Sequence, residues 1–380
     1  MSQINTNAIL DASGGTTATV NGFTPTVSNM AGRNRIINGD MRIDQRNAGA
    51  ATSGNDNTYA VDRFAYRANV AGKATSQQNM GSVTSPTGFN SYLGTTSSSA
   101  YSVGASESFR IEQIIEGYNV ADFQWGTANA KTVTLSFWVY SSLTGTFGGS
   151  VFNSGATRCY PFSYTISASN TWEYKTITIA GDTTGTWLTT NGSGLRVAFS
   201  LGCGSSISGT AGTWSGSTFL SATGATSVVG TSGATLYITG VQLEEGSVAT
   251  PFCPAGGGSY GAELALCQRY YYKVQNSSTN SFLSHFGRGV NSTTASVLTP
   301  FAVTMRTEPT ALETTGSASD YQVGVAGVGG YTCTSVPALS RATNSLGNVN
   351  LTVSGSLVAD GVYYARNATT NAFLAWSAEL

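Results

Sequence analysis

The sequence predicts an all-β protein: a jelly-roll β-sandwich, a short linker helix and a C-terminal β-sandwich. Apolar and polar side chains alternate with a period of two along many short segments, which is typical of half-buried strands. Clusters of Gly, Asn and Ser separate these segments, as in antiparallel sandwiches and jelly rolls. Apolar residues make up 40% of the 380-residue chain, which is enough for a sizeable core.

The clearest strand covers residues 133–140, where Val, Leu, Phe and Val occupy one face and Thr, Ser, Trp and Tyr the other. Residues 195–201 alternate equally regularly, and residues 172–179 and 235–243 follow the same pattern. We therefore expect these segments to be strands of one sandwich. The tryptophans that flank the first strand are interpreted as core residues: Trp125 and Trp138.

Composition sets the organisation around this sandwich. Residues 1–33 carry too few apolar side chains for a core of their own, so this leader either orders against a partner or remains a frayed tail. Residues 34–254 form the jelly-roll domain, residues 255–272 a linker with a short helix, and residues 273–380 a C-terminal β domain. Three consecutive glycines interrupt the β pattern within the linker.

The helix is expected over residues 263–272, because this stretch lacks Gly and Pro and contains Ala and Leu, which favour helix. The chain can equally enter a strand at the three tyrosines that end this stretch. In the C-terminal domain, residues 349–357 alternate again, and Asp360-Gly361 is a hairpin turn signal.

Charge and histidine content exclude several functions. Lys and Arg number 18 and Asp and Glu 19, so the formal net charge is −1 and there is no basic surface for nucleic acid or an anionic membrane. A single histidine argues against His-based catalysis and His-ligated metals. We expect no nucleic-acid partner, no cofactor and no metal, although one structural cation held by carbonyls and an acid such as Glu244 stays open.

The cysteines and the N-terminus bear on where the chain is made. Five scattered cysteines without a CxxC pair favour buried free thiols and assembly in a reducing cytoplasm. The N-terminus lacks the basic and apolar regions of a signal peptide. Between Arg196 and Glu244 lie 47 uncharged residues, of which 26 are Gly, Ser or Thr, so we expect no membrane insertion.

The residues offer little support for catalysis. His285 is the only candidate base, and it lies in an apolar setting that indicates a packed or half-exposed side chain. Glu112 and Glu116 share a face of a strand or helix, whereas Glu244 and Glu245 face opposite sides of a strand. The first pair is interpreted as a solvated rim, and a glycan-cutting site that uses it across a subunit interface stays open. No catalytic residue is predicted.

Aromatic side chains are the candidate ligand contacts. Trp187 and Trp214 lie in stretches rich in Gly, Ser and Thr, where an exposed indole can stack on the apolar face of a sugar ring. The alternative is that both cap the end of the sandwich core. Tyr331, Phe373 and Trp376 lie near expected strand ends, and for these the contact and core interpretations are both open.

Two stretches carry a family resemblance. Residues 34–46 (NRIINGDMRIDQR) with 59–64 (YAVDRF) resemble the opening of a domain common in bacteriophage tail fibre proteins. Residues 236–252 with 263–271 (ELALCQRYY) resemble its close and the junction to a distal domain, and residues 131–139 fit the same pattern. The pattern also resembles jelly-roll carbohydrate-binding modules. Together these stretches span well over half of the chain.

The resemblance implies a homotrimeric fibre in the virion tail, made in the host cytoplasm. Residues 1–33 would attach it to other tail or virion proteins, and the C-terminus would face the host. The expected function is adhesion to a host cell-surface polysaccharide, without enzymatic activity. The runner-up is a purely structural virion part, such as a head fibre or adaptor, and a glycan depolymerase is third. The chain departs from long fibres because it lacks an extended coiled-coil or β-helical shaft and a recognisable chaperone domain.

Overall fold

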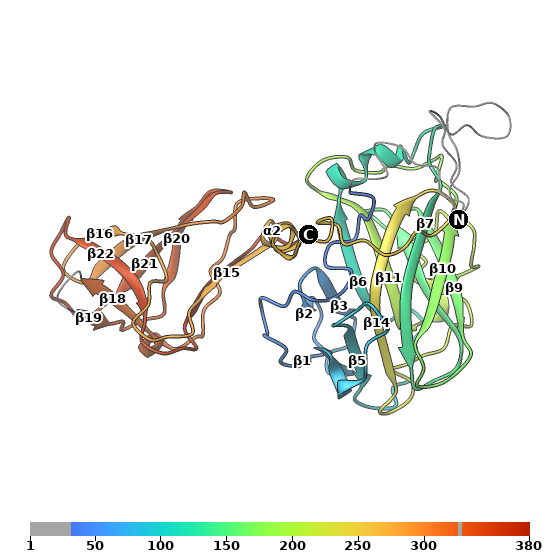
Figure 1. The fold of residues 1–380 in the computed structure, drawn as a ribbon, viewed down its shortest axis with the longest axis horizontal. Helices are drawn as coiled ribbons and strands as arrows, with labels where there is room; N and C mark the ends of the chain where they lie inside the picture. The colour runs from blue at the N-terminus through green and yellow to red at the C-terminus, as the bar shows by residue number, and fades with distance from the viewer. Residues whose placement is uncertain (1–31, 326–328) are drawn as a thin grey trace, which may run out of the picture. The chain divides into compact units, whose positions relative to one another are not determined.

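The computed structural model describes residues 32–325 and 329–380. The chain divides into two compact units, one ending at Glu263 and the other covering Leu264–Leu380. The regular elements of both units are mostly strands (Figure 1), so the all-β prediction is confirmed. The predicted attachment segment, residues 1–33, lies outside the described residues except for its last two positions.

The first unit consists of two six-stranded sheets. The first sheet contains, in spatial order, β1 (Thr52–Ser53), β4 (Ala74–Gln78), β5 (Leu93–Ser97), β14 (Thr235–Glu245), β7 (Val133–Ser141) and β10 (Glu173–Ile179). The second contains β2 (Thr58–Val61), β3 (Phe64–Ala68), β6 (Ser108–Glu116), β11 (Ser193–Cys203), β8 (Gly145–Phe152) and β9 (Cys159–Ile166).

The strand order is that of a jelly roll. Lettering β5 to β11 and β14 from B to I gives the orders B-I-D-G and C-H-E-F in the two sheets, and every neighbouring pair is antiparallel. Consecutive strands of this set therefore mostly alternate between the sheets, as in two interlocked Greek keys. The predicted jelly-roll sandwich is confirmed by this order.

The loops of this unit contain several short elements. They are η1 (Met80–Ser82), η2 (Gly117–Asn119), η3 (Ala121–Phe123), η4 (Ser205–Ile207) and the parallel pair β12 (Ser208–Gly209) and β13 (Ser221–Ala222). The loop from β11 to β14 crosses the outer face of the second sheet, because Phe219 and Leu220 pack on Phe152 and Ala198. The Ser150 hydroxyl donates to the Phe219 carbonyl oxygen at 2.7 Å and ties this loop down.

The core follows from the period-two pattern. The inward side chains of β7 are fully buried, and those of β11 join them in one apolar cluster. Trp125 belongs to the same cluster, as interpreted from the sequence. Trp138 does not: it lies half-buried on the outer face, because it alternates with the inward residues Phe137 and Val139.

The two stretches that carry the family resemblance contact each other in the fold. The Asn34 side chain donates to the carbonyl oxygens of Val241 and Cys253, and its Oδ1 accepts the Leu243 amide at 3.1 Å. The buried Glu263 carboxylate accepts the backbone amides of Asn38 and Gly256. The opening and closing motifs are therefore two halves of one hydrogen-bonded junction.

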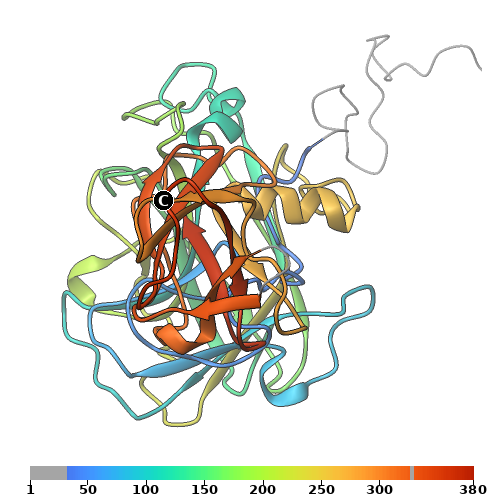
Figure 2. The ribbon, with the colours of Figure 1, turned by 90° about the vertical axis from the view of Figure 1, so that its left-hand side faces the viewer.

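The C-terminal unit is a smaller sandwich (orange to red in Figure 2). Its main sheet contains, in spatial order, β19 (Gly329–Thr332), β18 (Tyr321–Val325), β22 (Val362–Asn367), β16 (Gly287–Gly289), β17 (Thr294–Pro300), β21 (Leu346–Thr352) and β20 (Ala338–Ala342). A two-stranded sheet of β15 (Tyr271–Gln275) and β23 (Phe373–Ser377) shares its core. A 3-10 helix, η5 (Ala318–Asp320), precedes β18.

The linker region contains the helix α2 (Tyr260–Gln268), and the chain then enters β15 at Tyr271. The predicted helix is present, but it begins three residues and ends four residues earlier than expected, and the chain enters a strand at the tyrosines, as the alternative held. A turn at Asp360-Gly361 precedes β22, but the predicted hairpin is wrong, because β22 pairs with β16 and β18 and not with the preceding strand β21. No helix among the described residues is long and apolar enough to cross a membrane.

All five cysteines are free thiols. Cys159, Cys267 and Cys333 are buried, as the sequence indicated. Cys203 and Cys253 are only half-buried, so the expectation of five buried thiols is wrong for these two.

Candidate functional site

Three tryptophans from different loops meet at one end of the jelly-roll unit. Trp125 follows η3, Trp187 lies between β10 and β11, and Trp214 lies between β12 and β13. Their ring centroids are 4.8 to 5.6 Å apart and their planes are nearly perpendicular, the edge-to-face geometry that aromatic rings favour. The structure therefore brings together Trp187 and Trp214, the two residues that the sequence singled out in this domain.

Hydrogen bonds fix the orientation of both rings. The Trp187 indole N–H donates to Asp182 Oδ2 at 3.2 Å, and the Trp214 indole N–H donates to the Ala180 carbonyl oxygen at 2.8 Å. Asp182 is itself held by Arg158, whose Nε and Nη2 donate to its two oxygens at 2.8 and 2.6 Å. Both indole N–H groups therefore point into the protein, and only the ring surfaces are left for a ligand.

The charge of Asp182 is secured by these contacts. Burial raises the pKa of Asp182, but the hydrogen bonds from Arg158, the Thr184 amide and the Trp187 indole, together with the Arg158 charge, outweigh burial and hold the pKa below the ordinary value of 3.8. The carboxylate is thus ionised at neutral pH and remains an acceptor for the Trp187 indole.

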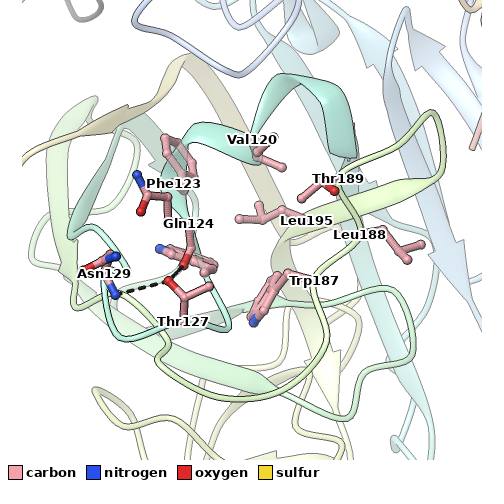
Figure 3. A pocket seen from close by; sticks show the side chains of 11 residues that line it. Val120, Phe123, Gln124, Thr127, Asn129, Trp187, Leu188, Thr189 and Leu195 are labelled. Carbon is pink, nitrogen blue, oxygen red and sulfur yellow. Dashed lines mark hydrogen bonds between the residues drawn. The ribbon is translucent and has the colours of Figure 1, made fainter.

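Trp187 lines a hollow of about 280 Å³, which we call the end pocket (Figure 3). Its floor is apolar and its rim is polar. The floor consists of Val120, Ala121, Phe123, Trp125, Trp187, Leu188 and Leu195, and the rim of Gln124, Thr127, Asn129 and Thr189. Trp214 does not line the hollow; it packs behind Trp125 and Trp187 and supports them.

Free hydrogen-bonding groups surround the end pocket. Within the described part of the chain, the side-chain amides of Gln124 and Asn129 have no hydrogen-bond partner in the protein, whereas Thr127 donates its hydroxyl to the Gln124 carbonyl oxygen at 2.7 Å. Gly126, at φ 85°, lets the loop turn beneath Trp187, because a Cβ there would lie 2.7 Å from the Gly185 carbonyl oxygen. An apolar floor with a few free polar groups is the usual composition of a small-ligand pocket.

A second aromatic hollow, which the sequence did not predict, is called the sheet-face groove. It measures about 360 Å³ and lies on the outer face of the first sheet, where Trp138 and Tyr174 have ring centroids 5.4 Å apart. Phe89 and Phe252 form its other wall, with ring centroids 5.1 Å apart. The alternation along β7 already placed Trp138 opposite the core, so the signal for this groove was present in the sequence.

The C-terminal aromatic residues do not form the expected exposed tip. Trp376 is fully buried, packed between Phe301 and Tyr272, with its indole over Gly347. The prediction that Trp376 contacts a ligand is therefore wrong, because pairing of β23 with β15 turns its side chain into the core.

The other two predicted C-terminal residues are half-buried. Tyr331 packs against the core of the C-terminal unit, and the Lys273 ammonium lies 4.5 Å from the centroid of the Phe373 ring. Phe282 and Phe286 are exposed instead, and both rings contact each other and the half-buried Tyr364. The single histidine, His285, is exposed beside them.

The carboxylate pairs differ from the sequence interpretation. Glu112 and Glu116 are both buried, so the solvated-rim interpretation is wrong. They lie four residues apart on β6, a separation of about 13 Å along a strand, which exceeds the 5 to 9.5 Å typical of glycosidase acids. Glu244 accepts hydrogen bonds from Gln242 and from the amide and hydroxyl of Thr250, so protein donors engage its carboxylate.

Comparisons with known proteins give structural likeness only. No protein-family model and no curated protein matches the chain. The enzymatically active domain of tailspike protein 4 of bacteriophage CBA120 is similar at 12% identity and a TM-score of 0.29, over 56% of this chain and 21% of that one. The chain thus spans about a fifth of that protein.

Two sugar-binding structures show a comparable likeness. TmCBM61 in complex with β-1,4-galactotriose has 10% identity and a TM-score of 0.28, over 56% of this chain and 99% of that one. A putative sugar-binding protein from Bacteroides thetaiotaomicron has 10% identity and a TM-score of 0.33, over 56% and 100%. At these values no residue is carried over from those proteins to this chain.

Proposed function

We propose that this chain is a bacteriophage tail fibre protein that binds a host cell-surface polysaccharide. The observation that carries the proposal is the end pocket: the Trp187 ring is held by Asp182, lines an apolar floor and is surrounded by the free amides of Gln124 and Asn129. Stacking of a sugar ring on the indole, with hydrogen bonds from its hydroxyls to the amides, fits this arrangement.

The sheet-face groove supports the same function. The indole N–H of Trp138 and the hydroxyl of Tyr174 have no partner among the described residues, and the Tyr174 side chain is well exposed. Rings that pair an apolar face with a free donor suit a neutral glycan. Two sites on one chain, repeated in a homotrimer, would add avidity to individually weak contacts.

The assignment to a phage virion rests on the sequence resemblance of residues 34–46 and 236–252. In this proposal residues 1–33 attach the trimer to other tail proteins, and the chain acts without catalysis. Deleting residues 1–33 is expected to leave a soluble trimer that no longer joins particles. Light scattering and particle incorporation test this, and a stable monomer or normal incorporation of the truncated chain would remove it.

Cell binding tests the adhesive function. Trp187→Ala is expected to weaken binding of labelled protein to host cells about tenfold, or about 1.4 kcal/mol. Tyr118→Ala is the matched control, because Tyr118 is an exposed aromatic residue of the same unit that does not line the end pocket. Removing the outer polysaccharide should abolish binding.

Two further measurements separate the alternatives. A structural head fibre or adaptor would not block infection when added as purified protein, whereas an adhesin would. A depolymerase would release sugar from host polysaccharide. Equal cell binding of wild type and Trp187→Ala would contradict the end pocket as the binding site.

A further inference from the structure

A third hollow, of about 340 Å³, lies on the outer face of the second sheet; we call it the arginine pocket. Its lining is mainly polar, unlike that of the end pocket. Its strand residues are Arg67, Ala68, Ser108 and Arg110, and its remaining residues are Asp56, Asn69, Ser106, Ile207, Thr218 and Leu220. The loop that crosses this face gives the hollow its second wall.

Two guanidinium groups lie side by side in this pocket. Arg67 on β3 and Arg110 on β6 are direct cross-strand partners in the register. Like charges at opposed positions destabilise a sheet unless something compensates them. Arg110 Nε donates to Glu112 Oε2 at 2.6 Å, and Arg67 Nε lies 3.2 Å from Asp56 Oδ1, so each arginine has one acidic partner.

The compensation is incomplete. Arg196 Nη1 donates to the second oxygen of Glu112 at 3.2 Å, so the fully buried Glu112 carboxylate serves two arginines. This ion-pair cluster therefore contains three guanidinium groups and two carboxylates. One positive charge is left over, and a ligand with a single negative charge would neutralise it.

Free N–H groups are available for that ligand. Arg110 Nη1 donates to the Ser108 hydroxyl at 2.7 Å and Arg67 Nη1 to Asn57 Oδ1 at 3.2 Å. Among the described residues, Nη2 of neither arginine has a hydrogen-bond partner. A planar guanidinium with free N–H groups matches the two oxygens of a carboxylate.

The remaining lining suits a polyhydroxylated molecule. Asn69 Oδ1 accepts the Ser108 amide at 2.8 Å, which leaves its amide N–H groups free to donate. Asp56 Oδ1 accepts the Ala68 amide at 2.9 Å, and its Oδ2 is free to accept a hydroxyl proton. A carboxylate in the lining disfavours a doubly charged phosphate, which it would repel, but it hydrogen-bonds well to sugar hydroxyls.

We propose that the arginine pocket binds the carboxylate of an acidic sugar unit, of the hexuronate class, in the host polysaccharide. This inference rests on the proposed glycan-binding function and names the kind of sugar. The carboxylate would lie against Arg67 and Arg110, with the ring hydroxyls toward Asp56 and Asn69. No bond is made or broken.

In the test, the full chain is titrated with glucuronate, glucose and inorganic phosphate, and the affinity for each is measured by calorimetry or NMR. Arg67→Gln is the informative variant, because the Asp56 side chain it leaves behind is 52% exposed and stays solvated. Arg288→Gln is the matched control, since Arg288 is an arginine in an exposed ion pair in the other unit. We expect wild type and the control to bind glucuronate alike, and Arg67→Gln to bind it at least tenfold more weakly. Glucose and phosphate should compete poorly.

The outcomes of these titrations separate the inference from the proposed function. Equal affinity for phosphate and glucuronate would show an adventitious anion site only and would overturn the inference. Unchanged glucuronate binding by Arg67→Gln would also overturn it. If glucuronate fails to bind while host polysaccharide still binds in a Trp187-dependent way, the inference fails and the proposed function stands. If host polysaccharide does not bind either, the proposed function fails as well.

Discussion

The end pocket and the arginine pocket belong to the same jelly-roll unit but are lined by opposite chemistry. The end pocket is formed by loop residues at the edge of the sandwich, with tryptophan rings as its floor. The arginine pocket lies on an outer sheet face, between strand residues that include both arginines and the loop that crosses this face. One framework thus offers both a stacking site and an ionic site.

The two sites differ in whether a charged group contacts the ligand directly. Trp187 is positioned by one ion pair behind it, Arg158–Asp182, and meets its ligand through an uncharged ring. Arg67 and Arg110 meet the ligand with the charge itself. The two sites should therefore respond differently to salt, to pH and to loss of a single side chain.

The largest expected effect is on the stability of the protein, through the ion pairs beside the arginine pocket. Arg110→Ala removes the closest partner of the buried Glu112 and leaves only Arg196, so we expect a loss of about 1.5–3 kcal/mol in the free energy of unfolding. Arg67→Ala is the control: its partner Asp56 is half-exposed, so the loss should be below about 1 kcal/mol. Denaturant unfolding measures both, and equal losses would show that Glu112 does not depend on Arg110.

The second effect is a separation of ligand preference. Trp187→Ala should weaken binding of a neutral oligosaccharide about tenfold and leave glucuronate binding unchanged, while Arg67→Gln should do the reverse. Calorimetric titration of both variants with both ligands gives the four values. If either variant weakens both ligands equally, the two pockets are not independent sites.

A smaller effect is expected with pH at the end pocket. The pKa of Asp182 lies below its ordinary value of 3.8, so its contribution is fully present above that pH and is lost only as pH falls through the lowered value. Binding of a neutral glycan should therefore be constant from pH 7 to about 4 and decline below it. A decline that starts near pH 6 would show that another group holds Trp187.

Much of the fold could be predicted from the sequence, because burial of one sheet face imposes a period of two. The β7 residues alternate so regularly that the amino-acid sequence alone predicts both the strand and its inner face. The contact between Asn34 and Val241 could not be predicted this way, since no local pattern pairs segments more than 200 residues apart.

The sites were only partly predictable. A tryptophan in a polar loop has few local partners, which identifies Trp187, whereas Trp138 is interpreted as a core residue although its alternation places it outside the core. Trp376 was misjudged because a position near a strand end does not reveal which face is covered. Glu112 looked solvated because neither the crossing loop nor Arg196 is near it in sequence.

The salt dependence of glycan binding tests the central claim most directly. Screening lengths fall from about 10 Å at 0.1 M salt to about 3 Å at 1 M, which weakens ionic contacts but hardly affects stacking on a ring. Binding of labelled protein to a neutral oligosaccharide, measured across this range for wild type, Trp187→Ala and Arg67→Gln, should change little with salt in all three and be weak throughout for Trp187→Ala. A tenfold or greater loss for wild type between 0.1 and 1 M would show ionic recognition and contradict the stacking mechanism.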